Sequence, residues 1–102
     1  MLLEWMIIGH LIGDFALQGD WIAANKGKSW EVNFYHAATH TAVLLLIVKV
    51  GTGVELAFWP ILILCASHFF IDALKARWGI VKTIWQDQLL HLGVMILIWL
   101  CH

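Results

Sequence analysis

Four long apolar stretches take up most of this chain and limit what it can fold into. They cover residues 2–19, 33–50, 54–78 and 82–101, and each is close to the roughly 20 residues that a helix needs to cross a bilayer. The chain is 62% hydrophobic, against about 45–50% in an average soluble domain. Since backbone polar groups in lipid must be paired within their own segment, the sequence predicts an all-α integral membrane protein.

The connections between these stretches are short, so we expect neighbouring helices to run antiparallel in an up-down-up-down four-helix bundle. Residues 1–102 then form a single transmembrane domain. Basic residues tend to remain on the cytoplasmic side of a membrane, which predicts that the first and third connections are cytoplasmic and that both termini lie outside. These connections carry Lys26, Lys28, Lys75, Arg77 and Lys82.

Charge and small residues bear on the partners of the chain. Only 13% of residues are charged and the net charge is −1, so there is no basic surface of the kind that nucleic acid requires, and we expect no nucleic-acid partner. The lipid bilayer is the expected partner. Gly9 and Gly13 form a small-xxx-small pair, which favours close packing within the bundle, while a dimer interface, and hence a homo-oligomer, stays open.

Each apolar stretch also contains one pair of ionisable residues four positions apart, a spacing that places both side chains on one face of a helix. Counted inward from the cytoplasmic end, the pairs fall at two matching depths and predict two stacked layers. The histidine layer holds His10, His40, His68 and His91, and the carboxylate layer holds Asp14, His36, Asp72 and Asp87.

Eight ionisable groups inside the spans need a physical reason. A charge near the bilayer centre costs at least about 2.5–3.5 kcal/mol, and an interhelical hydrogen bond returns only about 0.6–2 kcal/mol. Imidazole and carboxylate are ligands for zinc, iron and manganese. We therefore expect all eight residues to bind one or two divalent transition-metal ions, zinc being favoured over iron or manganese. A proton or ion pathway without bound metal is the alternative.

Four motifs carry these residues: H-x-x-x-D-F-x-x-Q at residues 10–18, H-x-x-x-H at 36–40, H-F-x-x-D-x-x-K at 68–75 and D-Q-x-x-H at 87–91. Together they resemble a family of small bacterial and phage integral membrane proteins known as domain of unknown function 3307. The resemblance covers almost the whole chain. It implies a shared site and a multi-pass protein of a bacterial inner membrane, or one encoded by a phage, and it attaches no activity.

A metal held by His and Asp lowers the pKa of its bound water and polarises a carbonyl or phosphoryl oxygen. We therefore expect a metal-dependent hydrolase that acts on a lipid or other membrane-borne substrate from the cytoplasmic leaflet. Asp14 or Asp87 is the expected general base. Lys75 is a candidate for holding a lipid phosphate, although pairing with Asp72 or anchoring at the headgroups explains it equally well.

Two other functions stay open at this point. The first is a metal or proton transporter or sensor, in which the stacked layers are stops along a pathway. The second is a di-iron oxidase, favoured by the H-x-x-x-H pair and weakened by the small number of carboxylates. We also expect Gln18 and Gln88 to orient metal ligands.

Overall fold

The computed structural model describes residues 2–16 and 19–101, and in these ranges the chain is helical and contains no strand. The all-α prediction is therefore confirmed. The elements, in chain order, are α1 (Leu2–Leu11), the π-helical segment η1 (Ile12–Ala16), α2 (Asp20–Asn25), α3 (Trp30–Thr52), α4 (Phe58–Asp72), the π-helical segment η2 (Ala73–Arg77) and α5 (Ile84–Cys101).

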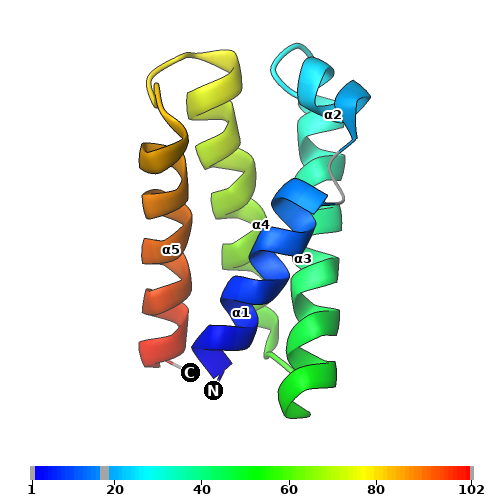
Figure 1. The fold of residues 1–102 in the computed structure, drawn as a ribbon, viewed down its shortest axis with the longest axis vertical. Helices are drawn as coiled ribbons and strands as arrows, with labels where there is room; N and C mark the ends of the chain where they lie inside the picture. The colour runs from blue at the N-terminus through cyan, green and yellow to red at the C-terminus, as the bar shows by residue number, and fades with distance from the viewer. Residues whose placement is uncertain (1, 17–18, 102) are drawn as a thin grey trace.

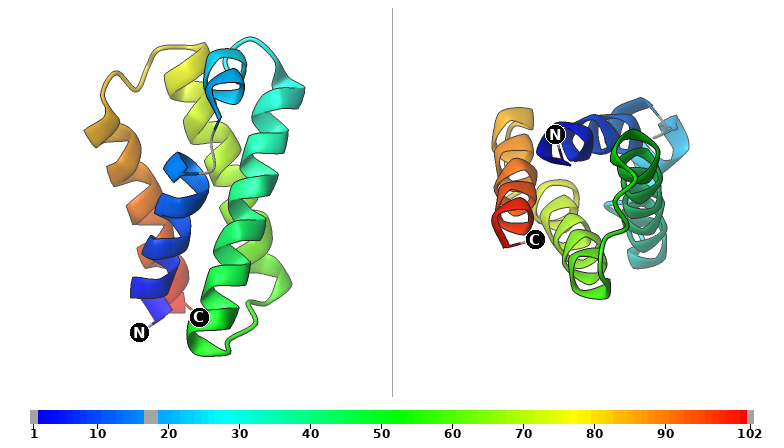
Figure 2. Two further views of the ribbon diagram at one scale, coloured as in Figure 1. Left: turned by 45° about the vertical axis from the view of Figure 1, so that its right-hand side comes forward. Right: turned by 90° about the horizontal axis from the view of Figure 1, so that it is seen from below.

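The four longer helices lie side by side around a common centre (Figures 1 and 2). α1 contacts both α3 and α5, and α4 contacts the same two helices from the other side. Consecutive long helices run in opposite directions, so the N-terminal end of α1 and the C-terminal end of α5 lie at the same end of the molecule (Figure 1). The short helix α2 and the connection from η2 to α5 lie at the opposite end.

The helix ends follow local chemistry. The Ser29 hydroxyl accepts a hydrogen bond of 3.3 Å from the Val32 N–H and so caps the start of α3. Gly53 ends α3 in a left-handed conformation with φ 75°, which glycine adopts without steric cost. The Thr83 hydroxyl accepts the Gln86 N–H at 3.1 Å at the start of α5. Each cap satisfies a backbone or side-chain group that would otherwise lack a partner.

These ends differ by a few residues from the predicted spans. α3 begins at Trp30 rather than at residue 33, because the cap at Ser29 lies earlier in the chain. α4 begins at Phe58 rather than at residue 54, because the residues after Gly53 form a non-helical connection. Pro60 then lies in the first turn of α4, where its missing N–H costs nothing.

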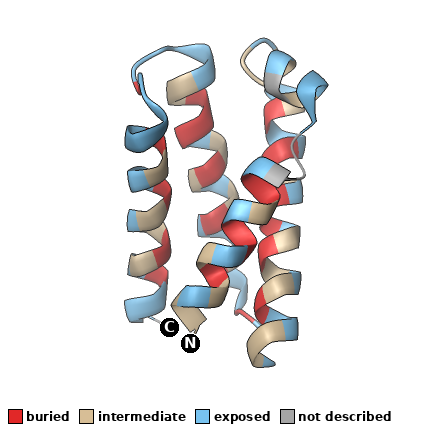
Figure 3. Ribbon diagram, viewed as in Figure 1, coloured by how far each residue is buried: buried red, intermediate tan, exposed pale blue. Residues whose placement is uncertain are grey.

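Three helical segments are long and apolar enough to cross a membrane, namely Trp30–Thr52, Phe58–Arg77 and Ile84–Cys101. Large apolar side chains such as Phe34, Leu62 and Leu97 are exposed on the outer surface, while the buried face of each long helix points to the centre (Figure 3). This pattern is consistent with a membrane protein. The described part of the first segment, residues 2–16, is shorter, and its crossing of the bilayer stays a prediction.

Small residues let α1 approach α3 closely. A Cβ added to Gly9 would lie 2.9 Å from the Cα of Leu44, and one added to Gly13 would lie 3.2 Å from the Cα of His40. Both glycines of the small-xxx-small pair therefore face α3, which confirms the interpretation that they pack within the bundle.

The centre of the bundle is divided into two halves. At the end with the termini it is filled by a cluster that we call the apolar half, consisting of Met6, Leu44, Val48, Leu56, Leu64, Met95 and Ile98. The other half is filled by buried polar side chains, and we call it the polar half. Its members are His10, Asp14, Asn33, His36, His40, His68, Asp72, Asp87 and His91.

Candidate metal centre

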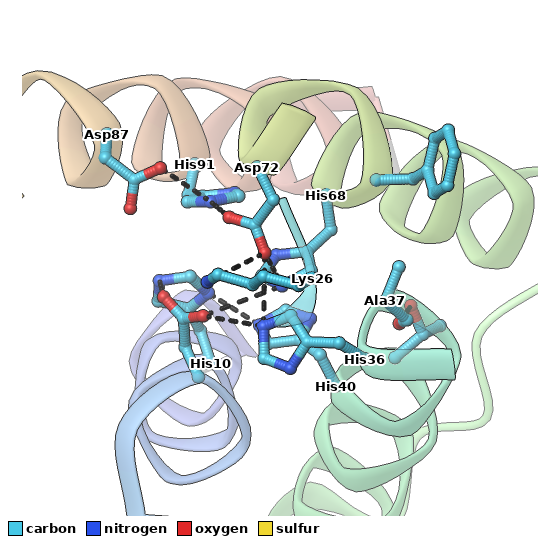
Figure 4. Close-up of polar contacts among 12 residues, drawn as sticks. His10, Lys26, His36, Ala37, His40, His68, Asp72, Asp87 and His91 are labelled. Carbon is cyan, nitrogen blue, oxygen red and sulfur yellow. Dashed lines mark hydrogen bonds and ion pairs between the residues drawn. The ribbon is translucent and has the colours of Figure 1, made fainter. Parts of the chain in front are cut away.

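All eight residues predicted as metal ligands are buried, with between 1% and 4% of their surface exposed. They come from α1, η1, α3, α4 and α5, so that every long helix contributes two of them. The seven of them labelled in Figure 4 point toward one region at the centre of the bundle, and Asp14 joins them through its contacts with His36 and His68. The positions that sequence spacing places on the inner faces therefore do meet in space.

The four rings of the histidine layer form a closed circuit, one ring from each long helix. Neighbouring ring centroids are 4.8 Å apart for His10 and His40, 3.9 Å for His40 and His68, 4.5 Å for His68 and His91, and 5.0 Å for His91 and His10. The predicted histidine layer is thus confirmed. His40 and His68 stack almost parallel, with 5° between their planes.

A first group of donors lies next to this layer and consists of Asp14, His36, His68 and Asp72. The Asp72 Oδ2 atom is 3.1 Å from His36 Nε2 and 3.2 Å from His68 Nε2. The Asp14 Oδ1 atom is 3.3 Å and 3.6 Å from the same two nitrogens. Two imidazole nitrogens and two carboxylate oxygens therefore surround one point.

These separations match those of atoms around a metal ion. Two ligand atoms that each lie about 2.1 Å from a tetrahedral ion are about 3.4 Å apart. Among the described residues, His68 Nε2 and Asp72 Oδ2 are buried and have no partner with hydrogen-bond geometry, even though they are close to each other. Asp72 Oδ2 also faces His36 and Lys26, and buried polar atoms rarely lack a hydrogen bond, so these atoms are candidate ligand atoms.

A second group contains Asp14, Asp87 and His91. The His91 Nε2 atom is 3.5 Å from Asp87 Oδ1 and 3.6 Å from Asp72 Oδ1. Within the described ranges, His91 Nε2 and Asp87 Oδ1 are again buried without a hydrogen-bond partner. Asp72 therefore directs Oδ2 to the first group and Oδ1 to His91, and Asp14 belongs to both groups. A carboxylate with one oxygen on each side is suited to bridging two ions.

A third group, His10, His68 and His91, overlaps with both of the others. Its member His10 already uses both ring nitrogens, because Nδ1 lies 2.7 Å from His40 Nε2 and Nε2 lies 2.8 Å from Gln88 Oε1. His40 belongs to none of the three groups that the described residues form. The geometry thus favours His40 and His10 as orienting partners, and their role as ligands stays a prediction.

Gln88 connects the two layers. Besides the contact with His10, its Nε2 donates to Asp14 Oδ2 at 3.1 Å and to Asp87 Oδ2 at 3.0 Å. Hydrogen bonds of this kind fix the orientation of ligating side chains. The expectation that Gln88 orients ligands is therefore supported, whereas Gln18 lies outside the described residues.

The structure adds two residues that the sequence reasoning did not place in the site. Lys26, in the connection between α2 and α3, places Nζ 3.5 Å from Asp72 Oδ2. Asn33 is 1% exposed and donates to the Phe69 carbonyl at 3.0 Å. Asn33 could have been found, because it precedes His36 by three positions and so shares its helix face. No spacing signal points to Lys26.

Lys75, the predicted phosphate-binding residue, lies in η2. In the part of the chain that the structure describes, the lysine paired with Asp72 is Lys26, and no ion pair is recorded for Lys75. Pairing between Lys75 and Asp72, one of the explanations open at the sequence level, is therefore not what the structure shows. Binding of a phosphate by Lys75 stays a prediction.

Both π-helical segments adjoin the carboxylates that face two donor groups. Asp14 lies within η1, and Asp72 immediately precedes η2, where the Ala73 N–H is shared between the Phe69 and Phe70 carbonyls. Single π-helical turns inside α-helices occur frequently at functional sites. Here they lie at Asp14, which belongs to two donor groups, and at Asp72, whose two oxygens face His36 and His91.

The chain belongs to the family described as "Protein of unknown function (DUF3307)", which matches residues 2–102. This match confirms the resemblance drawn from the four motifs. No curated protein and no solved structure matches the chain.

Proposed function

We propose that this member of the DUF3307 family is a membrane-embedded, metal-dependent hydrolase. The observation that carries the proposal is the first donor group, in which Asp14, His36, His68 and Asp72 bring two nitrogens and two oxygens to separations of 3.1–3.6 Å. Charged groups inside an apolar bundle are costly, and a bound cation offsets that cost. The set contains no thiolate, and nitrogen and oxygen ligands suit zinc, with iron or manganese as alternatives.

Two bound ions would account for more of the donor side chains than a single ion would. The first group supplies four donors and so resembles a closed tetrahedral site. The second group supplies Asp14, Asp87 and His91, and three protein ligands leave a coordination position for water, as in catalytic zinc sites. Asp14, which belongs to both groups, would be the ligand shared by the two ions.

In this proposal Asp14, Asp87 and His91 would hold an ion that, when bound, lowers the pKa of a water molecule and polarises a substrate oxygen. Hydrolysis of an ester or anhydride then needs a side chain that accepts a proton from the attacking water and returns it to the leaving oxygen when the bond to the leaving group breaks. Asp87 accepts the proton of the water. Its Oδ1 faces His91, while Oδ2, 3.0 Å from the Gln88 amide nitrogen, is not needed for the ion. Asp14 belongs to both groups, and its Oδ1 lies 3.3 Å from His36 Nε2, so it would act as a ligand shared between them.

The site would lie in the cytoplasmic half of a four-helix, up-down-up-down membrane bundle with both termini outside. The basic connections around Lys26 and Lys82 support this orientation. At the opposite end, Lys49 pairs with Glu55 at 2.8 Å, so that its charge is balanced locally. A substrate would then reach the site from the cytoplasmic leaflet of a bacterial inner membrane.

Metal content is the first test. Protein purified in detergent without chelator should contain two zinc ions per chain by inductively coupled plasma mass spectrometry, and dialysis against a chelator should remove them. Wild-type protein with metal at the background level of an empty-vector preparation would contradict the proposal. Iron accompanied by a visible absorbance band would favour the di-iron oxidase instead.

Hydrolysis is the second test. We expect the zinc-loaded protein to release p-nitrophenol from p-nitrophenyl phosphate or from a short-chain p-nitrophenyl ester in micelles, to lose this activity in chelator and to regain it with added zinc. The Asp87→Asn variant keeps the shape of the side chain, but an amide is both a poor proton acceptor and a poor metal ligand. Turnover should therefore fall at least about 100-fold, together with weaker zinc binding at the second group. Full turnover by that variant would remove Asp87 from the mechanism.

A metal carrier is the second candidate function, and one observation favours it. The donor groups overlap, because His68 belongs to the first and third groups and His91 to the second and third. An ion could therefore pass from one group to the next without leaving protein ligands. Zinc influx into proteoliposomes, in the absence of hydrolytic activity, would favour this function over hydrolysis.

A further inference from the structure

We propose that Lys26 binds a phosphate group, so that the substrate class of the site is a phosphate ester or phosphate anhydride rather than a neutral carboxylic ester. This inference rests on the proposed function, because it assigns the substrate of the same metal centre. The probe that represents the class is inorganic phosphate.

Lys26 lies beside the side chains proposed to bind the metal. Its side chain is 13% exposed, and its Nζ lies 3.5 Å from Asp72 Oδ2, in the same region as the Nε2 atoms of His36 and His68. Figure 4 shows the side chain pointing into the cluster. A lysine that enters a buried cluster bears a charge whose desolvation must be offset by a nearby anion. Lys26 is therefore at the site itself, whereas Lys75 is one helical turn beyond it.

The connection that carries Lys26 is held firmly. The Lys26 N–H bonds to the Ile22 carbonyl at 2.9 Å, which closes the last turn of α2. A Cβ on Gly27 would lie 2.5 Å from the Ala76 carbonyl oxygen, so only glycine permits this approach to η2. Ser29 then caps α3. The backbone on both sides of Lys26 is fixed against two helices, which pre-organises the ammonium group for a ligand.

The charges gathered at the proposed site favour a substrate that carries two negative charges. Asp14, Asp72 and Asp87 supply three carboxylates, and two divalent ions together with the Lys26 ammonium exceed them by roughly two positive charges when the histidines are neutral. A phosphate monoester dianion cancels this excess, whereas a neutral ester does not.

The source of the phosphate is suggested by the neighbouring surface. A pocket of about 470 Å³ is lined by Trp21, Ile22, Glu31, Val32 and Tyr35, and so lies between α2, which ends beside Lys26, and the start of α3. Its volume is within the usual range for ligand pockets, and its lining is mainly apolar and aromatic. An acyl chain fits such a pocket, so we expect the phosphate of a lipid headgroup to bind better than free phosphate.

The experiment measures the binding of inorganic phosphate to zinc-loaded protein in detergent by isothermal titration calorimetry. Lys26→Gln should weaken binding at least tenfold while two zinc ions remain bound, and Lys26→Arg should retain most of the affinity because it keeps the charge. The matched control is Lys28→Gln, which removes an exposed lysine from the same connection and should bind phosphate as the wild type does.

A second arm distinguishes the sources of the phosphate. Nanodiscs that contain phosphatidic acid or only phosphatidylcholine are compared as competitors of phosphate. Competition by phosphatidic acid alone supports a lipid headgroup. Equal, weak competition by both, with phosphate binding that depends on Lys26, supports a soluble phosphate compound.

Two results would overturn the inference. One is unchanged phosphate affinity in Lys26→Gln with its zinc retained, and the other is loss of zinc from Lys26→Gln but not from Lys26→Arg, which would make Lys26 a structural partner of Asp72. Absence of zinc from the wild-type protein is a different failure, that of the proposed function, and the elemental analysis reveals it before any titration.

Discussion

The two halves of the bundle are built from the same inward-facing positions of the same helices. On every long helix, a residue of the apolar half lies four positions from a residue of the histidine layer, so both share one face. The pairs are Met6 and His10, Leu44 and His40, Leu64 and His68, and Met95 and His91. Position in the helix therefore decides that a side chain is buried, and residue type decides whether that side chain packs or binds.

The halves differ in what they leave unsatisfied. Apolar side chains need only close contact, and in the apolar half they have it, since Met6 and Leu44 are 0% exposed. In the polar half, among the described residues, the Nε2 atoms of His68 and His91 and one oxygen each of Asp72 and Asp87 are buried without a hydrogen-bond partner. One half is a packed core in which no polar group needs a partner, while the other gathers buried nitrogen and oxygen atoms that a ligand could pair.

Asp72→Asn is expected to have the largest effect. Asp72 belongs to the first donor group, its Oδ1 also lies 3.6 Å from His91 of the second group, and an amide is a poor metal ligand of nearly the same shape. We expect the variant to lose both zinc ions, as measured by elemental analysis. Cys65→Ala is the matched control, because Cys65 lies one turn before His68 on α4 and joins no donor group that the described residues form. Two zinc ions bound to Asp72→Asn would show that the Asp72 carboxylate is not needed as a metal ligand.

His36→Ala should remove about half as much zinc as Asp72→Asn does. His36 belongs only to the first group, so we expect one zinc ion to be lost and one to remain. Asp14→Asn provides the contrast, because Asp14 belongs to both groups and its replacement should affect both ions. Equal losses in the two variants would indicate a single ion and contradict the two-ion arrangement.

Much of the polar half could be predicted from the sequence. The i, i+4 pairs at matching depths placed His10, His40, His68 and His91 in one layer, because side-chain direction on a helix is fixed by its period. The pairing of Asp72 with Lys26 could not be predicted, because a side chain from a connection reaches the site through tertiary packing that no helix period encodes. The π-helical turns at Asp14 and Asp72 also left no signal in the spacing.

His40→Ala should have a smaller effect on the metal than either carboxylate or His36. His40 contacts His10 at 2.7 Å and stacks on His68, so it orients other side chains. Removal of such an orienting partner typically weakens metal affinity about 10- to 100-fold. We expect two zinc ions at saturating zinc and a weaker dissociation constant in competition with a chromophoric chelator. Complete loss of one zinc ion at saturating zinc would show that His40 is itself a metal ligand.

Leu44→Ala should change the metal content least, although it damages the bundle. Leu44 is fully buried, and Gly9 of α1 lies against its backbone, so truncation leaves a cavity that costs on the order of 2 kcal/mol of stability. Because no polar atom loses a partner, the donor groups one turn away should still bind two zinc ions. A lower thermal midpoint in detergent together with unchanged zinc content would show that the halves are separable. Loss of zinc from the folded variant would instead show that the apolar half sets the ligand geometry, and that the two halves act as one.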